Sequence, residues 1–142
     1  MRGDTHVAFA FALSFLIFFP TCVTCIMMAV LYSIVPDYDI KYKHRKLFHN
    51  VFAMLLLTLP ALLFGPQVYL GAILGYASHL LSDIVTVRGV ALLYPLSERY
   101  FRVAKLRSSS PLANLAFLLF SGLLIAFKFY LLSHPLGSSV WR

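Results

Sequence analysis

The chain has 142 residues, of which 61% are hydrophobic and only 12% are charged. A soluble domain carries about 25% charged residues, so this composition excludes an ordinary soluble protein and favours the bilayer. The net charge is +7, but no aromatic and basic interleaving accompanies it, so we expect no nucleic-acid partner.

Four apolar runs predict an all-α, polytopic membrane protein, with the lipid bilayer as its first partner. A spanning helix needs about 20 apolar residues, and the runs give four to five membrane helices in a single domain over residues 1–142. The runs cover residues 7–35 (interrupted by Pro20), 51–64, 68–87 and 112–132. Nothing in them fixes the oligomeric state.

The first apolar run has two alternative structures. As one helix, residues 7–35 would hold His6 about 45 Å from Asp37, at 1.5 Å per residue. A turn at Pro20 would instead give two antiparallel helices of roughly 14 residues, each about 21 Å long. We favour this helical hairpin, because it returns His6 to Asp37 and puts Arg2 on the side of the other basic residues.

The first apolar run contains a cysteine pair and an N-terminal stretch that each allow a second interpretation. Cys22 and Cys25 form a C-x-x-C, which we interpret as small polarizable residues near a turn rather than as a redox or metal-binding pair. The N-terminal stretch resembles a signal peptide, but Asp4 and His6 interrupt its basic region and no A-x-A-like site follows. We therefore expect His6 to remain in the mature chain.

Two carboxylates follow the hairpin in Pro36-Asp37-Tyr38-Asp39. In an extended turn, side chains at i and i+2 point to the same side. Two close carboxylates repel each other unless a cation or a shared proton separates them. An ordinary helix-ending turn is the alternative.

A basic, histidine-containing connection comes next. His44 and His49 are five residues apart, which on one helix separates them by about 140°. We therefore place His44 in the loop and His49 in the first turn of the following helix. Arg45, Lys46 and Arg88 would surround a site there with charge suited to phosphate or another anion, although a patch that binds lipid head groups is an alternative.

The third apolar run carries His79 and Asp83 four residues apart. Residues at this spacing lie on one face of a helix and can converge on one ion. Thr86, one turn further, could support the carboxylate. A purely structural His–Asp hydrogen bond is the alternative.

The distribution of basic residues predicts that these clusters lie on the same side of the membrane. Basic residues gather around residues 41–46 and 99–107, and short basic connections are retained on the cytoplasmic side. Mixed imidazole and carboxylate donors favour zinc, manganese or iron, and the number of donors suggests one or two ions. The candidate metal ligands are His6, Asp37, Asp39, His44, His49, His79 and Asp83.

An ordered set of short motifs within roughly residues 1–97 resembles the YdjM-like family of LexA-regulated, inner-membrane, metal-dependent hydrolases. The resemblance implies that the histidines and aspartates of these motifs are metal ligands. Phe48 and Asn50 depart from the family pattern, which usually has Thr and Ser there, and this puts hydrogen bonding around the ligands in doubt. The motifs are Thr5-His6, Pro36-Asp37-Tyr38-Asp39, His44-Arg45-x-x-x-His49, Gly75-Tyr76-x-x-His79-Leu80-x-x-Asp83, Thr86, Gly89 and Tyr94-Pro95.

The sequence thus predicts a membrane-bound, metal-dependent hydrolase whose site faces the cytoplasm. Its substrate would be a phosphoester or a lipid-linked molecule, by analogy with zinc-dependent phospholipase C and P1-type nucleases, which the family's ligand set resembles. A metal-activated water would attack, Arg45 would stabilise developing negative charge, and Asp39 or Asp37 could act as the base. The alternatives are a metal-binding or metal- or proton-transporting protein without hydrolysis, and a structural protein that binds lipid head groups.

Overall fold

The computed structural model describes residues 1–41 and 46–134, and for residues 39–41 it describes the backbone alone. The described chain is helical, and segment 85–110 adds only isolated bridges, Thr86 with Leu106 and Val90 with Phe101. The predicted all-α class is therefore confirmed for this part of the protein. The α-helices are α1 (Gly3–Phe18), α2 (Val23–Tyr32), α3 (Val51–Thr58), α4 (Pro66–Ile84) and α5 (Pro111–Ser133), and the 3-10 helices are η1 (Val35–Lys41) and η2 (Leu59–Phe64).

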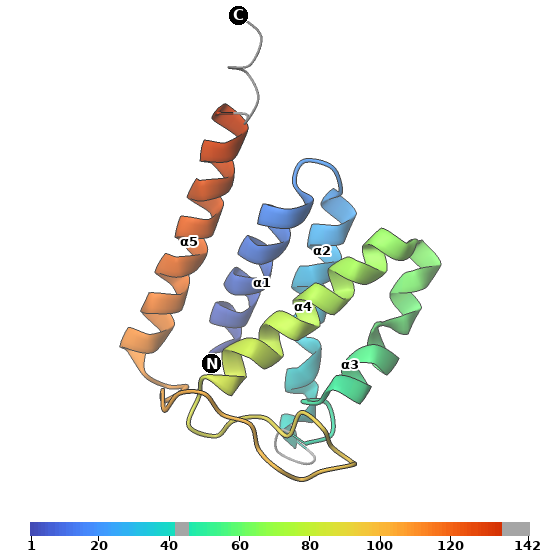
Figure 1. Cartoon of the computed structure of the whole chain (residues 1–142), viewed down its shortest axis with the longest axis vertical. Coiled ribbons are helices and arrows are strands. Elements are labelled where there is room, and N and C mark those ends of the chain that lie inside the picture. Colours follow the sequence, from blue (N-terminus) through green and yellow to red (C-terminus); the bar gives the residue numbers. More distant parts are fainter. Residues whose placement is uncertain (42–45, 135–142) are drawn as a thin grey trace, which may run out of the picture.

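Helices α1 and α2 form the predicted hairpin (Figure 1). Proline lacks an N–H and its ring clashes with the preceding turn of a helix, so α1 ends before Pro20 and the single-helix alternative is wrong. Cys22 caps α2, its Sγ accepting from the Cys25 N–H at 3.2 Å.

The two cysteines also form a disulfide, with a Cα–Cα distance of 5.3 Å. Our interpretation of them as merely small residues near a turn is therefore wrong. Their spacing allows the bridge because the turn brings the two Cα atoms within the range that a disulfide spans. The disulfide therefore joins the turn of the hairpin to the first helical turn of α2.

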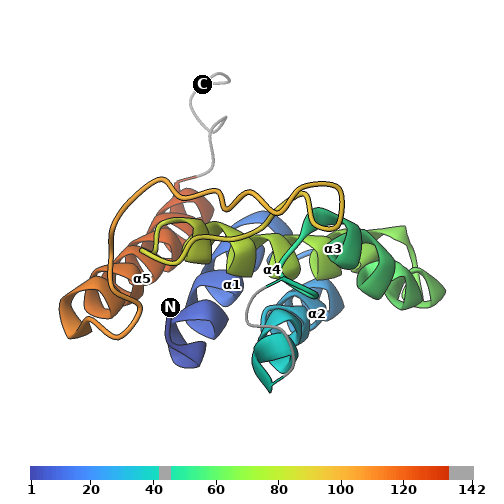
Figure 2. The ribbon, with the colours of Figure 1, turned by 90° about the horizontal axis from the view of Figure 1, so that it is seen from below.

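Helix α4 crosses the hairpin and packs closely on α2 (Figures 1 and 2). A Cβ added at Gly75 would lie 1.9 Å from the Ala29 carbonyl oxygen, and one at Gly71 would lie 2.4 Å from that of Cys25. The two glycines form a G-x-x-x-G pattern, which lets helix backbones touch. This close approach fixes the position of α4 relative to the end of α2.

Helix α5 packs on α1. The rings of Phe9 and Phe117 meet edge to face at 5.5 Å. Lys128 Nζ donates to the Leu16 carbonyl at 2.9 Å, a favourable place for a cation because Leu16 lies in the last turn of α1. The contact adds a charged hydrogen bond to the aromatic packing of the two helices.

Helix α5 alone among the described helices is long and apolar enough to cross a membrane. Shorter apolar helices cover Gly3–Phe18, Val23–Tyr38 and Val51–Phe64. The predicted four to five membrane helices are thus not established by helix length alone.

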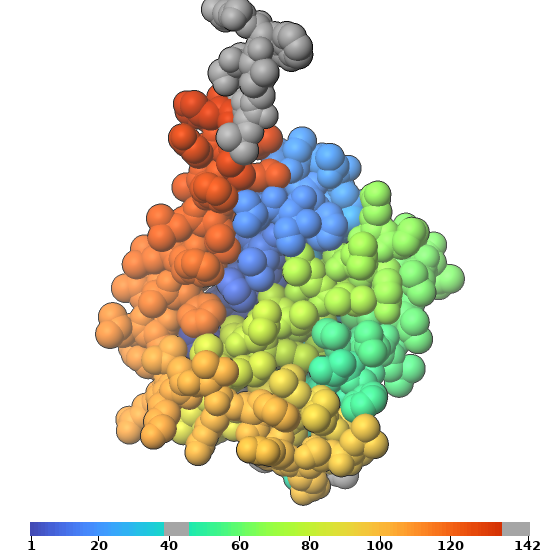
Figure 3. Space-filling model, in the orientation of Figure 1, coloured from blue at the N-terminus to red at the C-terminus, as the bar shows by residue number. Residues whose placement is uncertain are grey.

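Lys46 and the basic segment 99–107 lie at the same end of the molecule, where α1 begins and α4 ends (Figures 1 and 3). Lys46 Nζ pairs with Glu98 Oε2 at 3.3 Å, and the Val51 N–H donates to the Leu92 carbonyl at 3.0 Å. Segment 85–110 runs across this end and encloses the side chains gathered there.

Candidate metal centre

Helix α4 supplies the middle of a polar cluster in its last two turns. His79 and Asp83 are both fully buried, and His79 Nε2 lies 3.7 Å from Asp83 Oδ2. Their i, i+4 spacing places both on the same face of the helix, as the sequence predicts. A buried carboxylate is costly unless a cation or donors surround it, and here imidazoles from other elements approach it.

The first imidazole comes from α1, because the hairpin returns its beginning to the end of α4. His6 Nε2 lies 3.6 Å from Asp83 Oδ1. The His6 ring stacks on that of His79, with centroids 3.8 Å apart and planes inclined by 13°. The amino group of Met1 lies 2.5 Å from Asp83 Oδ1.

The second imidazole is His49, which lies just before α3. Its Nε2 is 3.6 Å from Asp83 Oδ2 and 3.3 Å from His79 Nε2. Asn50 begins α3 by accepting from the Ala53 N–H at 2.7 Å, and its Nδ2 donates to the carbonyls of Lys46 and Leu47. The departure from the family pattern at Asn50 thus preserves a helix cap.

Asp37 approaches from η1. Its Oδ1 lies 3.6 Å from His79 Nε2. The Asp37 side chain is 31% exposed, whereas those of His79 and Asp83 are fully buried. Asp37 is therefore the member of the cluster nearest to the surface.

Hydrogen bonds at the far nitrogens orient two of the rings. His79 Nδ1 lies 2.7 Å from the Ser33 carbonyl oxygen, and because a carbonyl only accepts, Nδ1 must carry the proton. Ser82 Oγ donates its single proton to the His79 carbonyl at 2.9 Å, so it accepts from His6 Nδ1 at 2.6 Å. In the neutral imidazoles both Nε2 atoms therefore hold a lone pair, the form that binds metal.

The donor spacings fit a small divalent cation. Two nitrogens about 2.0–2.1 Å from a tetrahedral ion lie about 3.3–3.4 Å apart, close to the 3.3 Å between the Nε2 atoms of His79 and His49. Two groups of donors each fit one ion, His6 with Asp37 and His79, and His49 with His79 and Asp83. Because both contain His79 and one Nε2 binds one ion, the described residues outline a single centre.

Five of the seven sequence-predicted ligands meet in this centre: His6, Asp37, His49, His79 and Asp83. His44 and Arg45 lie outside the described residues. The backbone of Asp39 belongs to η1, but its side chain is also outside the described part. The role of these three residues stays a prediction.

Sequence reasoning missed three residues that hold the ligands. Ser33 contributes only a backbone carbonyl, which no side-chain motif can reveal. Ser82 could have been found, because it lies one turn after His79 in the same helix. Asn114 is buried and accepts from Thr5 Oγ1 at 2.7 Å, tying α5 to the start of α1; an amide in an apolar run was the available signal.

Comparison with known proteins gives one family. The family model of the YdjM inner membrane protein matches residues 1–136, a longer stretch than the motifs cover. No curated protein and no solved structure matches the chain. The chain belongs to the YdjM inner membrane protein family.

Proposed function

We propose that this protein is a metal-dependent hydrolase of the inner membrane that acts on a phosphoester in or beside the bilayer. The observation that carries the proposal is the pair of imidazoles, His6 and His79, that both present Nε2 to one buried carboxylate. Each far nitrogen is held by an oxygen atom. Metal-binding histidines are typically oriented in this way.

In this proposal five described residues hold the ion, zinc first and manganese or iron next. A bound divalent metal would supply a Lewis acid and lower the pKa of water toward neutrality. Asp37, the most exposed of the five, would meet substrate, and it or Asp39 would take a proton where it is not engaged as a ligand. Asp39 and His44 would be further ligands, Arg45 would stabilise negative charge on the substrate, and a second ion would need these residues.

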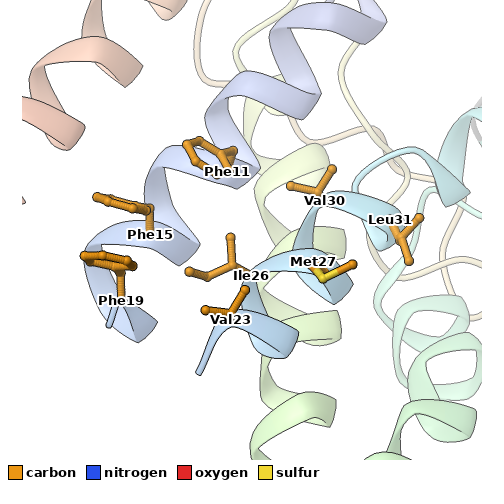
Figure 4. Close-up of a pocket in the computed structure, with 8 residues that line it drawn as sticks. All are labelled: Phe11, Phe15, Phe19, Val23, Ile26, Met27, Val30 and Leu31. Atoms are coloured by element: carbon orange, nitrogen blue, oxygen red, sulfur yellow. The ribbon is translucent and has the colours of Figure 1, made fainter. Parts of the chain in front are cut away.

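The proposal puts the cluster at the cytoplasmic face, with four to five helices in the membrane. Lys46 and the basic segment 99–107 lie at the same end as the cluster, which agrees with the positive-inside rule. The groove between α1 and α2 is walled by apolar side chains alone (Figure 4) and suits lipid hydrocarbon. Arms of 16 and 10 residues are short for a bilayer core of about 30 Å, so the hairpin would be re-entrant.

The structure gives less support to transport of metal or protons. A transport path would continue polar groups from the cluster across the bilayer. Thr58 and Ser121 are the hydroxyls suited to it, but Thr58 Oγ1 donates to the Met54 carbonyl and Ser121 Oγ to the Phe117 carbonyl, both within their own helices.

Metal content is the direct test. The protein purified in detergent should contain one or two divalent ions per chain by elemental mass spectrometry, and His79→Ala and Asp83→Ala should lose them. His134→Ala is the matched control, because His134 is exposed at the end of α5 and, among the described residues, its ring interacts with Ser133 and Tyr130 and not with the cluster. Unchanged metal in both cluster variants would refute the site.

Hydrolysis is tested separately, on the same preparations. The native protein should release product from a generic phosphodiester, lose this activity on chelation and recover it when metal is restored. Because chelation needs no mutation, it keeps the test valid even if a variant misfolds. If the protein binds metal but hydrolyses none of the phosphoesters tested, the enzymatic proposal is contradicted and the protein is a metal-binding one.

A further inference from the structure

A basic cavity lies immediately beyond the metal centre, at the end of α4. It measures about 250 Å³ and is lined by Thr86, Val87, Arg88, Arg107, Ser108 and Ser109. Thr86 is buried, and its Oγ1 donates to the Asp83 carbonyl at 2.8 Å. The cavity therefore begins one helical turn from a carboxylate of the metal centre.

Backbone pairing holds the two arginines on the same cavity. The Val87 N–H donates to the Leu106 carbonyl at 2.9 Å, and the Leu106 N–H donates to the Val85 carbonyl at 3.2 Å. This ladder places Arg88 and Arg107 one residue beyond each side of the pairing. Both arginines therefore line the cavity, from two segments that the bridge holds side by side.

The other wall of the cavity is fixed by a buried amide. Asn114 Nδ2 donates to the carbonyls of Ser108 and Ser110, at 2.9 and 2.8 Å. The same side chain accepts from Thr5 beside His6. One residue therefore positions both the serine loop of the cavity and the helix that carries a metal ligand.

The described residues do not neutralise the charge of the cavity, since neither Arg88 nor Arg107 forms an ion pair with any of them through its guanidinium. The Thr86 hydroxyl already donates its proton to the Asp83 carbonyl. Two guanidinium groups with the hydroxyls of Ser108 and Ser109 form a donor set that matches phosphate oxygens. The chemistry of the cavity is that of an anion site.

An apolar groove starts where this cavity ends. It measures about 470 Å³ and is lined by Phe9, Leu81, Ser82, Val85, Ala116, Phe117 and Phe120. Val85 of the groove precedes Thr86 of the cavity, and α5 follows the serine loop directly. Ser82, which holds His6, lines the groove. Cavity and groove together are basic at one end and apolar along the rest.

We propose that this cavity and groove, between α4 and α5, bind a membrane lipid whose head group is phosphate. Arg88 and Arg107 bind the phosphate, and one acyl chain lies along Phe117 and Phe120. The inference rests on the proposed function in one respect: it makes a lipid phosphoester, rather than a soluble one, the substrate of the metal centre. The groove between α1 and α2 is not the lipid site, because no charged residue lines it (Figure 4).

The test measures lipid binding to the whole protein in detergent by native mass spectrometry. Phosphatidic acid should bind at one site per chain, and diacylglycerol, which lacks the phosphate, should not. Arg88→Gln with Arg107→Gln should weaken phosphatidic acid binding at least about tenfold, since charge-assisted hydrogen bonds to the phosphate are lost. Arg99→Gln with Lys105→Gln removes the same charge from the same segment outside the cavity lining and should leave binding within about twofold.

A second pair of variants tests the groove. Ala116→Trp fills it and should abolish lipid binding, whereas Ala126→Trp makes the same change on an exposed position of α5 outside the groove lining and should not. Equal affinity of the arginine pairs, or of the two tryptophan variants, would overturn the lipid site. Displacement of the lipid by inorganic phosphate or glycerol phosphate at equal concentration would show a site for free phosphate and also overturn it.

The two proposals fail in different ways. His79→Ala should keep phosphatidic acid binding while it loses metal and hydrolysis, because His79 lines neither cavity nor groove. Lipid binding without any hydrolysis by the native protein would contradict only the enzymatic function. Metal-dependent hydrolysis of soluble phosphodiesters, with lipid binding indifferent to Arg88 and Arg107, would contradict only the lipid site.

Discussion

Two histidine rings of the centre are oriented by hydrogen bonds at Nδ1, the ring nitrogen that does not face Asp83. Ser33 and Ser82 contact the Nδ1 atoms of His79 and His6. These contacts select the tautomer and fix the ring plane, which would favour binding of a metal ion because the rings would need no reorganisation.

Ser82→Ala isolates this effect at a single residue. The substitution removes the acceptor for His6 Nδ1 while all five ligands remain, and the metal affinity should fall about 10–100-fold. Competition against a fluorescent chelator measures this fall. Ser121→Ala is the control, because Ser121 is equally buried but bonds only to its own helix; equal affinities in the two variants would show that Ser82 does not orient His6.

The residues of the site were largely predictable and their supports were not. A length argument on residues 7–35 placed His6 beside the other ligands, and the i, i+4 rule paired His79 with Asp83. The Ser33 carbonyl could not be predicted, since any residue has one. The cap at Asn50 replaces the family's usual residue by another that accepts the same hydrogen bond.

At the scale of elements, the centre depends on how closely α4 approaches α2. Gly75 lets the backbones touch beside Ala29, and Ser33 follows at the end of α2, where its carbonyl meets His79. The G-x-x-x-G pattern is visible in the sequence, but which helix it packs against is not. The partner was decided by the hairpin, which presents Cys25 and Ala29 on one side.

Gly75→Ala should therefore separate the two helices and disturb the centre. Overpacking of this kind costs about 1–3 kcal/mol or more, and the variant should unfold at lower temperature in detergent and bind less metal. Gly122→Ala is the matched control on α5, where an added Cβ meets nothing within 4 Å. It should be neutral or slightly stabilising, since alanine favours helix by about 1 kcal/mol over glycine, and an equal loss in both variants would contradict the packing argument.

The whole molecule has two unlike ends. One end holds the five described ligands, the arginine cavity, Lys46 and segment 99–107, and the other end holds the turn of the hairpin (Figure 1). The positions of the basic residues in the sequence predicted that the ligands gather at one end. The number of membrane passes was harder to predict, because the apolar runs break into short helices such as α3 and η2 rather than forming straight spans.

The Cys22–Cys25 disulfide indicates which compartment each end of the molecule faces. Disulfides persist in the bacterial periplasm and are rare in the reducing cytosol. The disulfide lies at the end of the molecule opposite Lys46 and segment 99–107, so a periplasmic disulfide would agree with the orientation that the positive charges favour. The disulfide and the charge distribution therefore both lead us to predict that the metal centre faces the cytoplasm.

Thiol labelling of intact cells tests this orientation. A maleimide that cannot cross the membrane should label Cys22 only after treatment with an impermeant reductant, because the partly exposed Cys22 would face the periplasm. A cysteine placed by Ser97→Cys, in a chain with both native cysteines replaced by serine, should react only after permeabilisation. The reverse labelling pattern would mean that the protein has the opposite orientation in the membrane.

The described ligands include no thiol, so reducing the Cys22–Cys25 disulfide should leave the metal bound. The redox state on one side of the membrane should therefore not control the chemistry on the other.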